Sequence, residues 1–137
     1  MKIRILQVGK NKDAYISDVS AEFIKRISPY AKVEVLEVGE DSLKKIDEKD
    51  FLIVMDERGE EMDSVKFSKF ISERKDDGDS LCFVIGGPFG LSDEIKAKAK
   101  KIISMSKMTF THQMIRIFLL EQIYRAFSII HDKGYHH

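Results

Sequence analysis

The hydrophobic positions of this chain follow two different spacings, and these alternate along the sequence. Short runs crowded with apolar residues predict strands, whereas apolar residues recurring every three or four positions predict amphipathic helices. Ser28-Pro29 ends the first helical pattern, and Asp76-Asp77-Gly78 ends the second. The predicted strands are 3–8, 33–38, 51–55 and 81–85, and the predicted helices are 13–27 and 65–71.

The third and fourth predicted strands, 51–55 and 81–85, are apolar without interruption. Such strands are typical of a parallel sheet whose two faces are both covered by helices. We expect the strand at 51–55 to end in a polar turn at 56–59. Because strands alternate with helices, the sequence predicts one α/β domain over residues 1–137, with a mainly parallel sheet and flanking helices.

The last third of the chain carries three further features. A glycine-rich turn at 86–90 leaves the fourth strand, and Ser92 then provides a hydroxyl cap for a helix start. Residues 107–110 form a short candidate strand. Residues 113–130 form a helix in which twelve of eighteen residues are apolar, on more than one face. This helix must be buried on two sides, either in the monomer core or partly against a second subunit.

Composition narrows the class of protein. Apolar residues make up 43% of the 137 residues, which argues against disorder. No apolar run is long enough to span a bilayer, and the first residues alternate apolar with charged side chains instead of forming a signal peptide. Cys82 is the single cysteine, so no disulfide can form within the chain, and we interpret it as inert core. We therefore expect a cytoplasmic protein with no membrane partner.

The formal net charge is +0, but it is unevenly distributed. Residues 95–137 contain eight Lys and Arg against two Asp and Glu, and they also contain all four histidines. The equal numbers of basic and acidic residues in the whole chain exclude a histone-like polycation. The basic excess in 95–137 still allows an anionic partner at this end of the chain. The lysines at 96–101 cannot share one helix face, and a solvated surface is their simplest interpretation.

The glycine turn at 86–90 is the first candidate for chemistry. Its glycines let the backbone approach a ligand at the carboxyl end of a strand, where open α/β sheets bind ligands. The alternative is a tight turn that only needs glycine conformations. The spacing matches neither the dinucleotide fingerprint nor the phosphate-binding P-loop.

The long apolar helix carries the other candidates. His112 stands where a loop enters this helix, and Arg116, one turn later, has no evident partner and could face an anionic substrate. Glu121 and Arg125 are four residues apart and can pair. His131 is most simply a residue that meets the helix dipole. We expect no metal site, because the histidines lack acidic or thiolate neighbours at a compact spacing.

Several segments together resemble one family. They are the opening KIRILQVGK at 2–10, FVIGGPFGL at 83–91, SMSKMTFTHQMIR at 104–116, EQIYRAF at 121–127 and Tyr135-His136. The chain is similar over its whole length to the RlmH family, the small SPOUT-class methyltransferases that methylate N3 of a pseudouridine in large-subunit (23S) ribosomal RNA. The resemblance implies an S-adenosylmethionine site within a C-terminal trefoil knot in about 80–137, completed by a homodimer.

The resemblance also assigns residues to the site. It implies cofactor contacts at Met55, Gly86, Gly87, Met105, Ser106, Lys107, Met108, Thr109 and Phe110. It implies that His112, Tyr135 and His136 orient or deprotonate the target base, with the choice of base left open. RNA phosphates would be held by Arg116, Arg125 and Lys133, of which Arg116 is also assigned to the catalytic site. The C-terminal tail would act either within one subunit or across the dimer.

Two other functions remain open at this point. One is a SPOUT methyltransferase for another RNA, such as tRNA, and the other is a ribosome-associated RNA-binding domain without activity. The substrate could be free ribosomal RNA or the assembled ribosome. The chain also departs from relatives, which commonly carry a longer segment with an extra helix where 40–50 stands, proline where Thr111 stands, and a basic residue where Glu60 stands.

Overall fold

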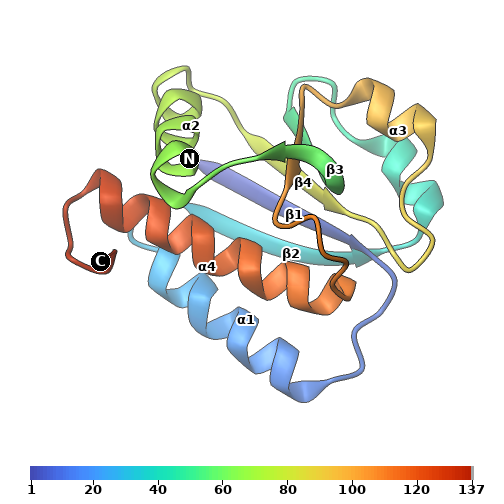
Figure 1. Cartoon of the computed structure of the whole chain (residues 1–137), viewed down its shortest axis with the longest axis horizontal. Helices are drawn as coiled ribbons and strands as arrows, with labels where there is room; N and C mark the ends of the chain where they lie inside the picture. The colour runs from blue at the N-terminus through green and yellow to red at the C-terminus, as the bar shows by residue number, and fades with distance from the viewer. Residues whose placement is uncertain (137) are drawn as a thin grey trace.

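The structure is a computed structural model that describes residues 1–136. A five-stranded parallel sheet forms its centre (Figure 1). The strand order is β2-β1-β4-β3-β5, and every pair of neighbours is parallel. The elements in chain order are β1 (Lys2–Val8), α1 (Ala14–Ile27), β2 (Lys32–Val38), the 3-10 helix η1 (Glu40–Lys45), β3 (Phe51–Glu61), α2 (Ser64–Asp76), β4 (Leu81–Ile85), α3 (Asp93–Lys98), β5 (Lys101–Ser104) and α4 (His112–Ile130). The predicted α/β class with a parallel sheet is confirmed.

Polar side chains cap the first turns of the α-helices. The Asp13 carboxylate accepts a hydrogen bond from the Tyr15 N–H at the start of α1, and Asp63 accepts one from Lys66 at the start of α2. Thr111 caps α4. These caps satisfy backbone donors that lack partners within the helix, and each α-helix begins directly after a Ser, Thr or Asp.

The sheet separates two hydrophobic cores. Alternate residues of β4 point to opposite faces, so that Phe83 joins the core beneath α1, α2 and α4, while Cys82 and Val84 join the core beneath η1 and α3. All five residues of β4 are buried, as expected for a strand covered on both faces. In Figure 1, α4 lies beside α1 and α2 on one side of the sheet and α3 lies apart from them.

Two sequence predictions are wrong. Residues 56–59 do not end the third strand, because β3 continues to Glu61 and resumes pairing with β5 after an irregularity between Met55 and Glu60. Residues 107–110 are not a strand, since they form an exposed loop and the fifth strand is Lys101–Ser104. At Gly59 a Cβ would lie 2.7 Å from the backbone carbon of Ile102, so glycine permits the close approach of β3 and β5.

The long helix α4 is buried on two sides, as predicted. Its inner residues, among them Leu119, Ile123 and Phe127, are fully buried, and the helix contacts α1, α2, β1 and β4. No helix within residues 1–136 is long and apolar enough to cross a membrane. Because all strands are parallel, their carboxyl ends meet at one edge of the sheet, and α4 begins beside that edge.

Candidate active site

A cavity of about 820 Å³ opens beside the carboxyl end of β4 and the middle of β3. Its walls are residues 55–58 of β3, the glycine turn, the loop after β5, and the first residues of α4. Eight of the nine residues expected at the cofactor line it, namely Met55, Gly86, Gly87, Met105, Ser106, Met108, Thr109 and Phe110. Three stretches of the chain, 55–58, 85–91 and 105–115, therefore converge on one cavity together with Lys96.

The glycine turn is a tight turn and a cavity wall at the same time. The Gly90 N–H donates to the Gly87 carbonyl over 2.9 Å, and Gly90 has a φ of +74°. A Cβ at Gly86 would lie 3.0 Å from the Gly90 carbonyl carbon, and one at Gly87 would lie 3.5 Å from the Val8 carbonyl oxygen. Glycine is therefore needed at 86 for space and at 90 for conformation.

Hydrogen bonds fix the loop that follows β5. The Ser104 hydroxyl donates to the Ser106 carbonyl over 2.9 Å, and the Ser106 hydroxyl accepts from the Met108 N–H over 2.9 Å. The Thr109 hydroxyl donates to Glu57 of β3 over 2.6 Å. Lys107 does not line the cavity; its exposed side chain reaches Glu61, with 3.6 Å between ammonium nitrogen and carboxylate oxygen.

An ion pair on the cavity wall was not foreseen from the sequence. Lys96 of α3 and Asp56 of β3 lie 2.9 Å apart, and both line the cavity. Partial burial acts to raise the pKa of Asp56, but hydrogen bonds from the Arg58 backbone and the Lys96 ammonium outweigh it, and the pKa lies below its ordinary value. The prediction that the lysines at 96–101 form a solvated surface is wrong for Lys96, which faces this cavity.

His112 is the first residue of α4, is half-buried, and lines the cavity. The Thr111 hydroxyl accepts from the Met114 N–H over 3.3 Å, which fixes where the helix starts. A Cβ added to Gly9, directly after β1, would lie 3.9 Å from His112 Nε2. The imidazole thus sits between the end of β1 and the cavity, at the loop-to-helix junction that the sequence indicated.

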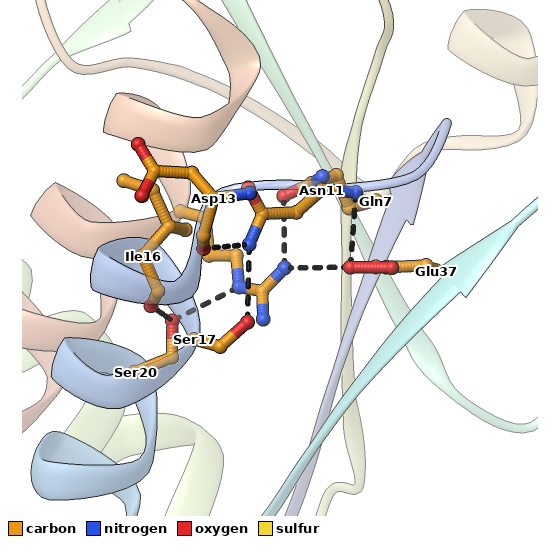
Figure 2. Close-up of polar contacts among 8 residues, drawn as sticks. Gln7, Asn11, Asp13, Ile16, Ser17, Ser20 and Glu37 are labelled. Carbon is orange, nitrogen blue, oxygen red and sulfur yellow. Dashed lines mark hydrogen bonds and ion pairs between the residues drawn. The ribbon is translucent and has the colours of Figure 1, made fainter.

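Arg116 has partners, contrary to the sequence prediction, and it is buried at 6% exposure. Its Nε donates to the Ser20 hydroxyl over 3.0 Å, and its Nη1 lies 3.4 Å from both Gln7 Oε1 and Glu37 Oε1. Figure 2 shows these three partners arriving from β1, α1 and β2. A guanidinium enclosed in this way is not available to an RNA phosphate, so its geometry is that of a residue that positions α4.

The same network reaches the loop between β1 and α1 (Figure 2). Glu37 Oε1 also accepts from the Asn11 N–H over 3.1 Å, and the Asn11 amide donates to the Asp13 carbonyl and the Ser17 hydroxyl. Buried Gln7 keeps its Nε2 without a hydrogen-bond partner in residues 1–136. The loop, β2 and α4 are therefore tied together beside the edge of the sheet that carries the cavity.

The C-terminal tail folds back onto the middle of α4. The Tyr135 hydroxyl donates to Glu121 over 3.2 Å, and Arg125 pairs with Glu121, as the spacing predicted. The Arg125 guanidinium lies over the Tyr135 ring and donates to His136 Nδ1 over 3.1 Å. Burial and the neighbouring Glu121 carboxylate raise the pKa of Tyr135.

This tail cluster and His112 do not meet within one subunit. Glu121 is nine residues beyond His112 in α4, which is roughly 13 Å along the helix axis at 1.5 Å per residue. Lys133 is exposed, and the exposed His131 stacks on Tyr30 with 4.8 Å between ring centres. The predicted catalytic residues therefore fall into three places, namely the cavity wall, the buried network and the tail.

Cys82 is a buried core residue. Burial raises the pKa of its thiol to about 12, which agrees with an inert side chain.

Within residues 1–136, no group of three or more His, Cys, Asp or Glu side chains is arranged to hold a metal ion. The polar residues that line the cavity come from the middle of β3, α3, the loop after β5 and the start of α4.

Comparison with known proteins decides the family. Residues 1–136 match the family model described as "Predicted SPOUT methyltransferase". This chain belongs to the SPOUT methyltransferase family. Curated relatives named Ribosomal RNA large subunit methyltransferase H, from Trichlorobacter lovleyi and Cytophaga hutchinsonii, are 42% and 41% identical, with all of both chains aligned.

Solved structures give the same SPOUT methyltransferase fold. A methylase family protein from Haemophilus influenzae Rd KW20 superposes with a TM-score of 0.61 over 97% of this chain and 67% of its own, at 13% identity. One from Neisseria gonorrhoeae has a TM-score of 0.58 over 90% of this chain and 81% of its own, at 9% identity. The alignment with the Trichlorobacter relative is 153 positions long, whereas this SPOUT methyltransferase has 137 residues, so the relative carries additional residues.

Proposed function

We propose that this SPOUT methyltransferase transfers a methyl group from S-adenosylmethionine to large-subunit (23S) ribosomal RNA, at N3 of a pseudouridine on the assembled ribosome. The observation that carries the proposal is the likeness over the full chain to relatives named Ribosomal RNA large subunit methyltransferase H, at up to 42% identity in the relatives compared. The cavity at the strand ends supplies a place for the reaction. Family membership also supports a trefoil knot within about 80–137 and, with the ribosome as substrate, a location in the cytoplasm.

The cavity suits S-adenosylmethionine in size and chemistry. Its volume of about 820 Å³ lies within the usual range for small-molecule sites. Close backbone packing at Gly86 and Gly87 leaves peptide groups at its wall, and Met55, Met105 and Met108 add apolar surface. The cofactor supplies a methyl group on a positively charged sulfur. The cavity wall carries two carboxylates, Asp56 and Glu57, against two cations, Arg58 and Lys96, so it has no net positive charge that would repel the sulfur.

His112 is suited to handle the proton on N3 of the target base. Methylation at N3 requires this proton to leave, and a side chain that accepts it typically contributes about 10²–10⁴-fold in rate. His112 lines the cavity, and its ring is held between Gly9 and the start of α4. Tyr135 of the same subunit is less suited to be the base, because its raised pKa keeps the phenol protonated.

A homodimer would bring the tail to the cavity. A second cavity of about 680 Å³, lined by residues of α1 and α4, shares Met105 and Phe110 with the first. Its lining includes the exposed Tyr15 and the half-buried Phe118. A second copy seated on this apolar face would lie next to the cofactor cavity, so that its Tyr135 and His136 could approach His112. Arg125 and Lys133 would then stand at the RNA-facing rim.

The decisive experiment is mass spectrometry of RNA after reaction with the protein and isotope-labelled S-adenosylmethionine. Assembled ribosomes, free large-subunit RNA and tRNA are offered in parallel. We expect label on one pseudouridine of the large-subunit RNA, chiefly from ribosomes. Label on tRNA alone would replace this function with the other enzymatic one. No label on any RNA, with cofactor binding demonstrated, would indicate an RNA-binding protein without activity.

A further inference from the structure

Phe89 is a fully exposed large hydrophobic side chain at the mouth of the cofactor cavity. It is the most exposed of the large hydrophobic residues in the described part of the chain. An aromatic ring in water gains nothing for the stability of the monomer, because stabilisation by apolar groups comes from their burial. Its place on the cavity rim makes the ring accessible to a partner outside the monomer.

The chain holds this ring on a stiff support. Phe89 follows Pro88, whose φ is fixed by its ring, in the turn closed by the hydrogen bond from the Gly90 N–H to the Gly87 carbonyl over 2.9 Å. Gly87 in turn packs on the end of β1. A support of this kind presents the ring in a defined direction, so that little backbone freedom is lost when a partner binds.

Two more exposed apolar side chains line the same cavity. Met108 is 73% exposed and Phe110 is 40% exposed, and both belong to the loop after β5. Arg58, also exposed, adds a positive charge to this wall. Flat aromatic surface beside positive charge is the combination with which proteins bind unpaired nucleotides, through stacking on bases and contacts with phosphates.

We propose that Phe89 is a stacking platform for a base of the substrate RNA, which holds the RNA at the cavity mouth. The inference rests on the proposed function, since it assumes an RNA substrate. Adenine of the cofactor is the less fitting occupant, because it would lie inside the cavity while the Phe89 ring is wholly exposed. A second copy is also less fitting, because Phe89 is absent from the lining of the apolar α1–α4 cavity.

Substitution of Phe89 tests the proposal on the methylation reaction. Base stacking on an aromatic side chain is worth about 1–3 kcal/mol, so Phe89→Ala and Phe89→Leu should each raise the KM for ribosomal substrate roughly 5- to 150-fold. Phe89→Tyr should stay near wild type. The dissociation constant of S-adenosylmethionine should not change. Leu36→Ala is the matched control, because Leu36 is an exposed apolar residue of β2 that does not line the cavity.

Fluorescence gives a direct readout of stacking. The chain contains no tryptophan, so Phe89→Trp introduces a single reporter at the site. A pseudouridine-containing RNA stem–loop should quench its emission, whereas an oligonucleotide of the same length made of abasic sugar–phosphate units should not. S-adenosylmethionine alone should leave the emission unchanged.

The outcomes separate this inference from the proposed function. If the wild type methylates ribosomes but Phe89→Ala keeps its KM within twofold and RNA does not quench the tryptophan, the stacking role is wrong and the enzyme function stands. Quenching by S-adenosylmethionine alone would assign the ring to the cofactor instead. Quenching that rises with protein concentration in the absence of RNA would assign it to a second copy. Either result overturns the inference.

Discussion

Arg116 and Ser20 are 96 positions apart in the sequence, yet the guanidinium Nε donates to the hydroxyl over 3.0 Å in the interior. The contact joins α4 to α1 one turn beyond His112. Two more acceptors, on β1 and β2, surround the same guanidinium. The start of the long helix is thus fixed by one buried cation, and the position of His112 depends on it.

We expect Arg116→Met to destabilise the protein by about 2–4 kcal/mol, because it leaves the buried Gln7 amide without the donor to its oxygen and removes the ion pair with Glu37. Arg116→Lys should be nearly as costly, since an ammonium cannot span three acceptors arranged around a planar guanidinium. Urea denaturation measures both. A double-mutant cycle with Ser20→Ala should give a coupling of about 1 kcal/mol or more. Unchanged stability with lost RNA binding would instead support a phosphate contact.

Glu60 makes a pH-dependent contribution to stability. Hydrogen bonds from Lys101 and Lys66 lower its pKa from 4.5 to about 2. A carboxyl group whose pKa is lower in the folded state stabilises the fold above its ordinary pKa, and this stabilisation is lost as the pH falls through the lowered value. The melting temperature of the wild type should therefore exceed that of Glu60→Gln at pH 7, and the gap should close between about pH 4.5 and 2.

The exposure of this cluster adds a second check on the Glu60 prediction. Because the carboxylate and both lysines are in contact with water, added salt should shrink the gap at pH 7. A gap that is the same at all pH values would mean that the substitution acts through packing. It would contradict the assignment of the low pKa to Lys101 and Lys66.

Secondary structure could be predicted from the sequence where a segment's own residues determine its conformation. Uninterrupted apolar runs predicted the central strand β4 and the first half of β3, and the Ser92 cap predicted the start of α3. The strand Lys101–Ser104 was missed because it has only two apolar residues and follows a lysine-rich segment. The second half of β3 was missed because it is polar, and only its pairing with β5 makes it a strand.

The same difference separates the residues that were placed at the cavity wall from the contacts that were missed. The glycine turn and the loop 105–110 are continuous segments, so the pattern of the first and the family resemblance of the second could indicate them. The partners of Arg116 lie 79 to 109 positions away, and Asp56 meets Lys96 only once β3 and α3 are in place. No spacing rule relates such positions, because the parallel sheet brings together strand ends from distant parts of the chain.

Under the proposed mechanism, in which the imidazole accepts the proton on the base, His112→Ala should lower kcat for ribosome methylation by about 10²–10⁴-fold and leave cofactor affinity within twofold. Isothermal titration with S-adenosylmethionine and single-turnover methylation separate the two effects. His131→Ala is the matched control, since this histidine stands at the other end of α4, outside the cavity. Activity of His112→Ala within a few-fold of wild type would show that another group accepts the proton.

The tail could act on the cavity of its own subunit or on that of the partner subunit. Within one subunit Tyr135 and His136 are held beside Glu121 and Arg125, about 13 Å along α4 from His112. We therefore expect them to act on the partner's cavity. Homodimers of His112→Ala, and homodimers of the Tyr135→Phe, His136→Ala double variant, should each be nearly inactive.

A heterodimer of these two variants distinguishes the arrangements. It can be isolated by co-expression with two different affinity tags. If the tail acts across the dimer, one of its two sites combines an intact His112 with an intact tail, so that it should recover about half of the wild-type activity. If the tail acts within its own subunit, both sites are defective and the heterodimer stays inactive. Full activity of the tail double variant by itself would show that the reaction does not need Tyr135 or His136.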